Sequence, residues 1–186
     1  MHIEISGKVS SILARKKIST VWTIGPNATV IDSIRLMDEK NVGALPVVEN
    51  GKLVGVVSER DYTRKIILKG RSSKDTPVSD IMTRQVLTVN PSNSVTECMQ
   101  IMTDRRVRHL PVLDGSNLVG ILSIGDVVNW LISAQKAMIE NLERYTLARV
   151  NGYELPSHYL TYGSFLGGSS LQDDFPCVIA LGNNSD

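Results

Sequence analysis

Two copies of a Ser-x-x-Asp motif are the clearest candidates for chemistry in this chain. The first is Ser58 with Asp61, and the second is Ser123 with Asp126. A hydroxyl and a carboxylate at this spacing form a capping box where they open a helix, and such a box needs no ligand. The same position can serve binding, because the first amides of a helix that leaves a strand can face an anion. The pattern leaves both interpretations open.

Arg108 and His109 are the main candidates for holding a phosphate group. Arg108 offers paired donors that match phosphate oxygens, and His109 carries a charge that switches near neutral pH. Each also has a simpler explanation, as an exposed Arg in a salt bridge and a structural His held by hydrogen bonds. Arg60, beside Asp61, is a weaker phosphate candidate, because helical spacing lets it and its basic neighbours lie on a solvated face.

Both motifs lie within an internal repeat. Residues 20–67 align with residues 85–132 without a gap, and 15 of the 48 aligned positions are identical. A repeat of this kind indicates two copies of one structural unit. The copies differ chemically at one pair of positions, which holds Gly43 and Ala44 in the first copy and Arg108 and His109 in the second. We therefore expect two related sites that are not chemically equal.

Each unit is predicted to have the element order β-α-β-β-α. A short β-rich run precedes a helix that opens with a capping box, and two buried strands joined by turn residues then lead into a second helix. In the first unit these elements are the run 20–24, the cap Thr29-x-x-Asp32, the strands 44–48 and 53–57 around Asn50-Gly51, and the helix 58–68. In the second unit they are the run 85–89, the cap Ser94-x-x-Glu97, the strands 110–113 and 118–122 around Asp114-Gly115, and the helix 123–132.

The predicted fold class is α/β, of the α+β kind, with two tandem units. A unit of this size buries too little surface to be comfortably stable alone, so the two should pack face to face with pseudo-two-fold symmetry. The predicted boundaries are 5–69 for the first domain, 78–133 for the second, 134–148 for a C-terminal helix and 149–186 for a flexible tail.

The composition excludes several classes of protein. Of the 186 residues, 42% are apolar and 21% charged, which is typical of a globular chain. The 20 basic and 19 acidic side chains leave no global field that would attract nucleic acid or an anionic membrane. Cys98 and Cys177 belong to no metal-ligand pattern, which argues against a zinc site and for a reducing compartment. No signal peptide or membrane span is expected, so we predict a cytoplasmic location.

The repeated residues resemble the tandem cystathionine β-synthase (CBS) domain pair, or Bateman module. The resemblance covers about residues 5–145. It rests on two repeated patterns, Gly43-Ala-Leu-Pro-Val47 with Arg108-His-Leu-Pro-Val112, and Leu53-Val-Gly-Val-Val-Ser-Glu-Arg-Asp61 with Leu118-Val-Gly-Ile-Leu-Ser-Ile-Gly-Asp126. More narrowly, the chain is similar to the small stand-alone CBS-pair proteins of bacteria, which have plant organellar relatives.

The resemblance implies two clefts that bind an adenosine compound. In that family the Asp of the motif accepts hydrogen bonds from ribose hydroxyls, and the Ser hydroxyl helps to hold sugar or phosphate. One cleft is implied to contain Val21, Val42, Gly43, Ala44, Ser123 and Asp126. The twin cleft is implied to contain Ser58, Asp61, Met82, Thr83, Val86, Val107 and Arg108, with Arg60 and His109 assisting on the phosphate side.

The function implied is that of a regulatory sensor. It would bind AMP, ADP, ATP, NAD(H) or S-adenosylmethionine, with no catalytic cofactor, and modulate an unidentified protein partner. A structural pair whose motifs only cap helices is one alternative. Nucleic-acid binding through Arg105-Arg-Val-Arg108 is another, although two of these cations end a helix, where its dipole alone favours them. An enzyme is not expected, because His2, His109 and His158 have no recognisable nucleophile or metal partner.

A homodimer is also predicted. An apolar stripe follows the second unit at helical spacing and should pack on a neighbour. Its members are Leu131, Ala134, Met138, Leu142 and Tyr145. The resemblance implies dimers formed through helices, and the polar segment beyond Tyr145 shows no pattern that suggests chemistry.

Overall fold

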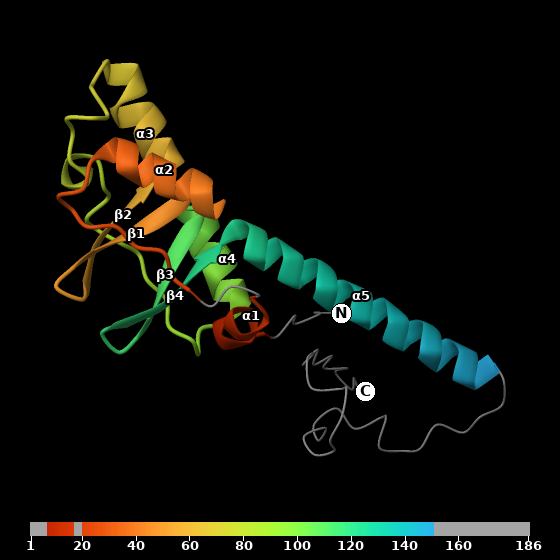
Figure 1. The fold of residues 1–186 in the computed structure, drawn as a ribbon. Helices are drawn as coiled ribbons and strands as arrows, with labels where there is room; N and C mark the ends of the chain where they lie inside the picture. The colour runs from red at the N-terminus through yellow and green to blue at the C-terminus, as the bar shows by residue number, and fades with distance from the viewer. Residues whose placement is uncertain (1–6, 17–19, 151–186) are drawn as a thin grey trace.

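The computed structural model describes residues 7–16 and 20–150, and in it two small antiparallel sheets are flanked by helices (Figure 1). The predicted tail falls outside this range from residue 151 onward. The first unit contains α2 (Val30–Lys40), β1 (Ala44–Glu49), β2 (Lys52–Ser58) and α3 (Glu59–Lys65). The second unit contains α4 (Val95–Asp104), β3 (His109–Asp114), β4 (Asn117–Ser123) and α5 (Ile124–Val150), while α1 (Val9–Arg15) precedes both units.

The mixed α and β fold with two tandem units is confirmed. The hairpins also follow the turn chemistry. Asn50 and Gly51 both have positive φ, at 49° and 76°, as a two-residue type I′ turn requires. In the second hairpin Asp114 pairs with Asn117, so the two turn residues are Gly115 and Ser116, one position later than predicted.

The β-rich run that opens each unit contributes less to its sheet than the sequence predicts. Instead of a strand, the first run makes one parallel bridge, between Ile24 and Val47, and the second makes the matching bridge between Val89 and Val112. Both bridges lie where the hairpin register shifts, after Val47 and after Val112. Each run therefore crosses its hairpin at the bulge without following a strand.

The helix starts are set by the predicted caps. The Thr29 side chain accepts a hydrogen bond from the Asp32 amide, and Ser94 forms a reciprocal capping box with Glu97. The last helix differs from the prediction. No break separates the second unit's final helix from the C-terminal helix expected at 134–148, and α5 runs without interruption to Val150.

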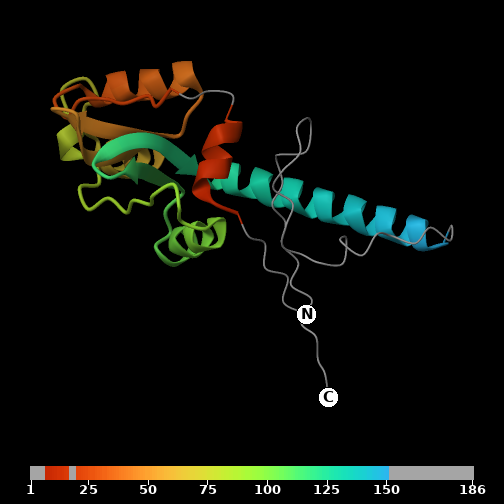
Figure 2. The ribbon, with the colours of Figure 1, turned by 90° about the horizontal axis from the view of Figure 1, so that it is seen from below.

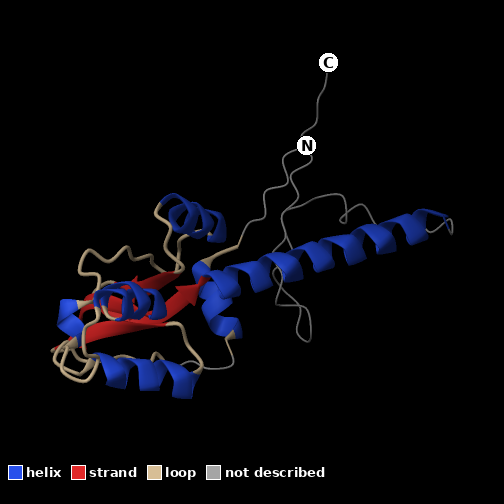
Figure 3. Cartoon of the chain, turned by 90° about the horizontal axis from the view of Figure 1, so that it is seen from above, coloured by secondary structure: helices blue, strands red, loops and turns tan. Residues whose placement is uncertain are grey.

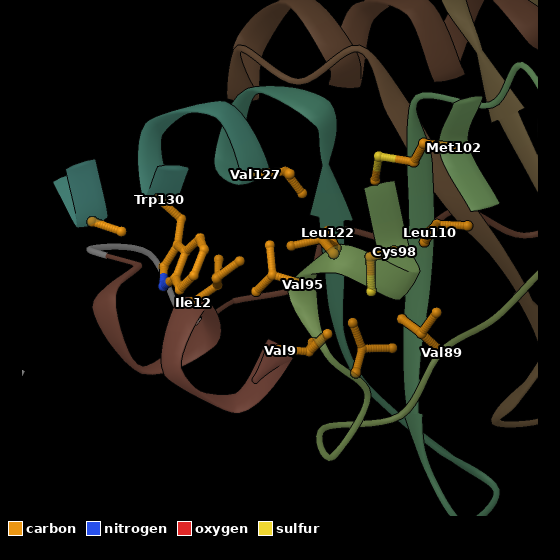
Figure 4. Close-up of a cluster of buried hydrophobic side chains, with 12 residues drawn as sticks. Val9, Ile12, Val89, Val95, Cys98, Met102, Leu110, Leu122, Val127 and Trp130 are labelled. Carbon is orange, nitrogen blue, oxygen red and sulfur yellow. The ribbon is translucent and has the colours of Figure 1, made fainter. Parts of the chain in front are cut away.

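The hydrophobic cores are built across the repeat. Val9 and Ile12 of α1 lie in the core of the second unit, with Val95, Leu110 and Leu122 (Figure 4). The corresponding residues before the second unit, among them Val78 and Ile81, lie in the core of the first. Each segment that precedes a unit thus completes the core of the other unit.

Cys98 lies inside the second core as a free thiol. Burial, reinforced by the nearby charge of Glu97, raises its pKa to about 11. A thiol of this kind stays protonated near neutral pH, so Cys98 acts as a packing residue.

Two glycines at equal positions of the repeat allow these crossed contacts. A Cβ atom on Gly55 would lie 2.5 Å from the sulfur of Met82, and one on Gly120 would lie 2.7 Å from a methyl carbon of Leu13. Real Cβ atoms do not come so close to other atoms. Glycine at these two positions therefore lets the preceding segment of one unit lie directly against the sheet of the other.

Arg106 offers a test of backbone strain. It adopts φ +54°, while Asn41 at the same position of the first copy adopts φ +51°. Arg is poorly suited to this left-handed conformation, whereas Asn tolerates it. We expect Arg106→Asn to raise the free energy of unfolding by about 1 kcal/mol. The neighbouring Arg105→Asn, at a right-handed position, is the control for charge loss in thermal denaturation, and an equal shift for both would contradict the strain argument.

Candidate ligand-binding site

The first Ser-x-x-Asp motif forms a complete capping box at the start of α3. Asp61 Oδ2 accepts hydrogen bonds from the Ser58 amide at 3.0 Å and from the Ser58 hydroxyl at 2.6 Å. The other carboxylate oxygen, Oδ1, lies 2.7 Å from the Nζ atom of Lys65, which also donates to the carbonyl oxygen of Ile81. Both carboxylate oxygens of Asp61 are thus engaged within the protein.

The second motif has the same cap but a different ion pair. Asp126 Oδ2 accepts hydrogen bonds from the Ser123 amide at 2.7 Å and the Ser123 hydroxyl at 2.6 Å. The Nζ atom of Lys16 lies 2.8 Å from the same oxygen and donates to the Ile121 carbonyl oxygen at 2.7 Å. Within the described residues these contacts all fall on Oδ2, so Oδ1 keeps its capacity to accept hydrogen bonds from a ligand.

The surroundings of Asp126 keep it ionised. Burial by itself would raise the pKa of this carboxyl group, but the hydrogen bonds from Lys16 and Ser123 outweigh burial, and the pKa lies below its ordinary value. Near neutral pH the side chain is therefore a carboxylate that accepts hydrogen bonds, as recognition of hydroxyl groups requires.

A cavity of about 260 Å³ opens beside Asp126, between α1 and α5. Its lining combines one carboxylate, two cations, two neutral polar side chains and two apolar ones. These residues are Asp126, Arg15, Lys16, Asn129, Ser133, Ile12 and Trp130. A smaller cavity of about 100 Å³ shares Lys16 and is lined also by Val21, Gly120 and Ile121. Lys16, which pairs with Asp126, therefore lines both cavities.

His109 lies where the two units meet. A Cβ atom on Gly43 would be 3.5 Å from His109 Cε1 and 3.3 Å from Glu59 Oε2. Because glycine has no side chain, the side chains of His109 and Glu59 can lie close to the backbone of Gly43. Burial lowers the pKa of His109, the charges of Arg108 and Lys16 lower it further, and Asp126 opposes them. His109 is therefore neutral near pH 7, and a neutral imidazole holds phosphate less strongly than the cation that the sequence suggested.

The two predicted arginines differ in exposure, and Arg60 is half-buried. Arg108 is exposed, and in the described part of the chain its guanidinium makes no ion pair. Arg60 donates from α3 of the first unit to the carbonyl oxygen of Arg106 in the second, at 3.1 Å. Arg60 thus has a structural role in joining the units, and Arg108 stays available to an anion.

The remaining predicted residues divide between cavity, core and surface. Val21 lines the smaller cavity beside the second unit. Met82 is buried against Gly55, while the backbone of Thr83 pairs with Val56 of β2. Of the rest, Ala44 is buried, Val42 and Val107 pack against the two cores, and Val86 is half-buried.

Sequence reasoning missed the roles of three residues in this region, among them Lys65, which it placed on a solvated face. Lys65 follows Asp61 by four positions on one helix, a spacing that could have revealed their ion pair. Trp130, at the equivalent position of the second unit, packs against Gly7, where a Cβ atom would lie 2.0 Å from the indole ring. Lys16 lies 110 positions before Asp126, and no local pattern connects the two.

No group of three or more His, Cys, Asp or Glu side chains that could hold a metal ion occurs in the described residues. Among the helices of that same part of the chain, none has the length and apolar character needed to span a membrane. The site therefore consists of a hydrogen-bonded carboxylate, cations and apolar walls.

These features define a class of protein: two copies of a small α+β unit, each with a Ser-x-x-Asp motif at the end of its second strand. The profile of the CBS domain matches residues 9–68 and 78–133, which is more than half of the chain. The chain therefore belongs to the CBS-domain family and is a tandem CBS pair, which confirms the resemblance that the sequence suggested.

Several known CBS-domain proteins are similar to this chain in sequence or structure. A solved structure of a proposed signal-transduction protein with CBS domains from Burkholderia ambifaria is 50% identical, with a TM-score of 0.68 over 69% of this chain and 96% of that chain. The mitochondrial CBS-domain protein CBSX3 of Arabidopsis thaliana is 46% identical over 122 residues, 63% of this chain and 59% of that protein. The CBS-domain protein YhcV of Bacillus subtilis is 40% identical over 107 residues, 58% of this chain and 76% of that protein.

Proposed function

We propose that this chain is a regulatory module that binds a phosphorylated adenosine compound in the cavity beside Asp126 and thereby changes its affinity for a protein partner. The observation that carries the proposal is the combination, in one cavity, of an ionised Asp126 with a free acceptor oxygen and the cations Arg15 and Lys16. Oδ1 would accept from the ribose, the cations would hold phosphate, and Trp130 would offer an apolar surface to the base. The relative described as a signal-transduction protein is in keeping with a regulatory role.

The two Ser-x-x-Asp motifs would then have different roles. Asp61 has both carboxylate oxygens engaged by Ser58 and Lys65, which favours a structural role for the first motif. A ribose at that position would first have to displace Lys65. We therefore expect one strong adenosine site for each chain, beside the second motif.

The position of the larger cavity, beside Asp126, would allow a bound ligand to change the affinity for a protein partner. It is bounded by α1, which precedes both units, and by α5, which ends the second unit. A ligand bound there can shift the position of α1 relative to α5 only as far as its affinities for the two positions differ. The partner would then recognise a surface that depends on that position.

Calorimetry with AMP, ADP, ATP, NAD(H) and S-adenosylmethionine tests the proposal directly. We expect saturable binding of at least one phosphorylated member with one site for each chain. If none of the five compounds produces heat or a thermal shift at millimolar concentration, the proposed function is wrong, and a structural pair becomes the better description.

Lys16→Met separates the phosphate contact from the ribose contact. Methionine keeps most of the apolar stem and removes the charge, and a hydrogen bond to a charged group contributes roughly 1.5–3 kcal/mol. We expect AMP to bind roughly 10- to 150-fold more weakly, while adenosine binding is not weakened. Lys65→Met, at the first motif, is the matched control. Equal affinities of AMP and adenosine in the parent protein would remove the phosphate role of Lys16 but leave adenosine binding intact.

A further inference from the structure

Four arginines lie where the first unit meets the second. Arg60 and Arg64 lie about one turn apart on α3, and Arg105 and Arg106 directly follow the last residue of α4. A hydrogen bond of 3.1 Å, from Arg60 Nη1 to the carbonyl oxygen of Arg106, joins the two pairs. Arg60 is half-buried, and the other three are exposed. These four residues form an arginine patch, with two members from each unit.

The arginine patch has no carboxylate partner in the part of the chain that the structure describes. None of its four guanidinium groups forms an ion pair there. Three acidic residues adjoin the patch in sequence, namely Glu59, Asp61 and Asp104. Asp61 pairs with Lys65, and the other two form no ion pair within the same described residues. The four guanidinium groups therefore outnumber the two carboxylates left beside them, and the patch carries an excess of positive charge.

Two members of the patch occupy positions that disfavour arginine. Arg60 lies in the first turn of α3, where the helix dipole is unfavourable to a cation. Arg106 adopts φ +54°, a left-handed conformation that suits Asn or Gly better. Only Arg105, at the C-terminal end of α4, gains from the helix dipole. Local structure therefore does not explain the arginines at positions 60 and 106, and residues that conflict with their local structure are typical of functional surfaces.

The internal repeat supplies a comparison within the same chain. At the equivalent positions of the other copy, the arginine patch is replaced by three neutral residues and one lysine. These residues are Gly125, Asn129, Asn41 and Lys40. Lys40 is engaged, since its ammonium group pairs with Glu39 at 2.6 Å and lies 4.4 Å from the ring of Trp22. Both copies form the same helix-strand-strand-helix unit, so the fold of a unit does not require the arginines.

We propose that the arginine patch binds an acidic segment of a protein partner, one that carries apolar as well as acidic side chains. Guanidinium groups match carboxylates through paired hydrogen bonds. Directly after α3 come Ile67 and Leu68, which are 56% and 75% exposed and are the most exposed large apolar side chains among the described residues. A segment of mixed composition would contact both the arginines and these two side chains. That the segment belongs to the regulated partner rests on the proposed function, but its binding to the patch requires no nucleotide.

A nucleic acid fits the patch less well. Proteins that bind single strands stack the bases on aromatic side chains, and Tyr62, the aromatic residue of α3, packs against the first core instead. The 20 basic and 19 acidic side chains of the chain supply no wider positive field around the patch. Exposed aliphatic side chains such as Leu68 also offer nothing to a phosphate backbone.

The arginine patch is separate from the cavity beside Asp126. None of its four residues lines either described cavity. In all three views the first unit, with α3, lies at the end of the molecule opposite the extended part of α5, whereas the larger cavity lies between α1 and α5 (Figures 1, 2 and 3). A nucleotide in that cavity would therefore leave the patch free to bind a second ligand.

Fluorescence anisotropy of the full chain with a labelled peptide of repeated Glu-Glu-Leu tests the charge complementarity. We expect saturable binding that weakens as the salt concentration rises, because salt screens exposed charges. The same peptide with Ser in place of Glu should not bind. Absence of binding by the acidic peptide at millimolar concentration, or equal binding of the two peptides, would overturn the proposal.

A double variant, Arg64→Gln with Arg106→Asn, tests whether the patch is the binding surface. It removes one arginine from each unit and keeps Arg60, which joins the units. Because an exposed ion pair contributes little, we expect the acidic peptide to bind roughly 2- to 30-fold more weakly. Since Arg106→Asn is expected to stabilise the fold, thermal denaturation separates lost binding from lost folding. Lys52→Gln with Lys136→Gln removes two exposed cations elsewhere and, as the matched control, should bind the peptide as the parent does.

The results also distinguish this proposal from the proposed function. Weaker peptide binding by the double variant with unchanged AMP binding would support the patch, and peptide binding by a protein that binds no nucleotide would keep the patch and reject the nucleotide site. Equal peptide binding by the double variant and the parent would overturn the proposal. So would a loss of AMP binding in the double variant, or an oligothymidylate of the same charge that binds the patch more tightly than the peptide.

Discussion

Asp126→Ala is expected to weaken AMP binding roughly 10- to 150-fold, while Asp61→Ala is expected to leave it nearly unchanged. The reason is the different use of the two carboxylates: among the described residues, Asp61 has contacts on both oxygens, whereas the contacts of Asp126 fall on Oδ2. Loss of a hydrogen bond between a ligand hydroxyl and a charged acceptor costs roughly 1.5–3 kcal/mol, which corresponds to this range of affinities. Calorimetry on the two variants measures the difference.

A cap control is needed because both substitutions also remove a capping residue. Glu97→Ala removes the acidic partner from an equivalent capping box at the start of α4, at a residue that lines neither described cavity. It should lower stability slightly, through loss of the hydrogen bond to the Ser94 amide, and leave AMP affinity unchanged. If Glu97→Ala weakens binding as much as Asp126→Ala does, the loss reflects helix capping rather than recognition. If Asp61→Ala has the larger effect, the assignment of the site to the second motif is wrong.

The second large effect concerns stability. Val9→Ala and Val78→Ala are each expected to lower the free energy of unfolding by about 2 kcal/mol, because each deletes two buried methyl groups from a packed core. Both valines are fully buried, and they occupy equivalent places before the two units. Chemical denaturation measures the loss. A value near zero for Val9→Ala would mean that α1 is not a stable part of the second core.

Hydrogen exchange then tests whether the cores are crossed. Val9 packs with the second unit and Val78 with the first, although in sequence each precedes the other unit. Val9→Ala should therefore accelerate exchange mainly in α4, β3 and β4, and Val78→Ala mainly in α2, β1 and β2. If each substitution instead loosened the unit that follows it in sequence, the crossed arrangement would be contradicted.

Under the proposed function, the crossed cores would give a physical route from ligand binding to regulation. The helix that contributes Val9 and Ile12 to the second core is followed at once by Lys16, which pairs with Asp126. A phosphate that attracted Lys16 would pull on a segment that connects the core of the second unit to the start of the first. Any response would then reach both units, with no change required in either sheet.

Much of the fold could be predicted because its determinants are local. The capping boxes and the Asn50-Gly51 turn each depend on residues a few positions apart, and each is present in the structure. The internal repeat can be found by comparing the sequence with itself. The opening runs were less predictable, since β-rich composition does not say whether a segment follows a strand or only crosses it, as Ile24 and Val89 do. The length of α5 was also misjudged, because nothing in the chain marks a helix end near residue 134.

For the site, the sequence by itself determined the two Ser-x-x-Asp motifs, and the change from Gly43 and Ala44 to Arg108 and His109 predicted that the two sites are not chemically equal. Only the tertiary structure decided that the two carboxylates also differ in their ion pairs. Lys65 reaches Asp61 from the next turn of one helix, but Lys16 reaches Asp126 only because α1 packs on the opposite unit. Periodicity and spacing describe neighbours along the chain, whereas an ion pair across two packed segments depends on how those segments bury their apolar faces.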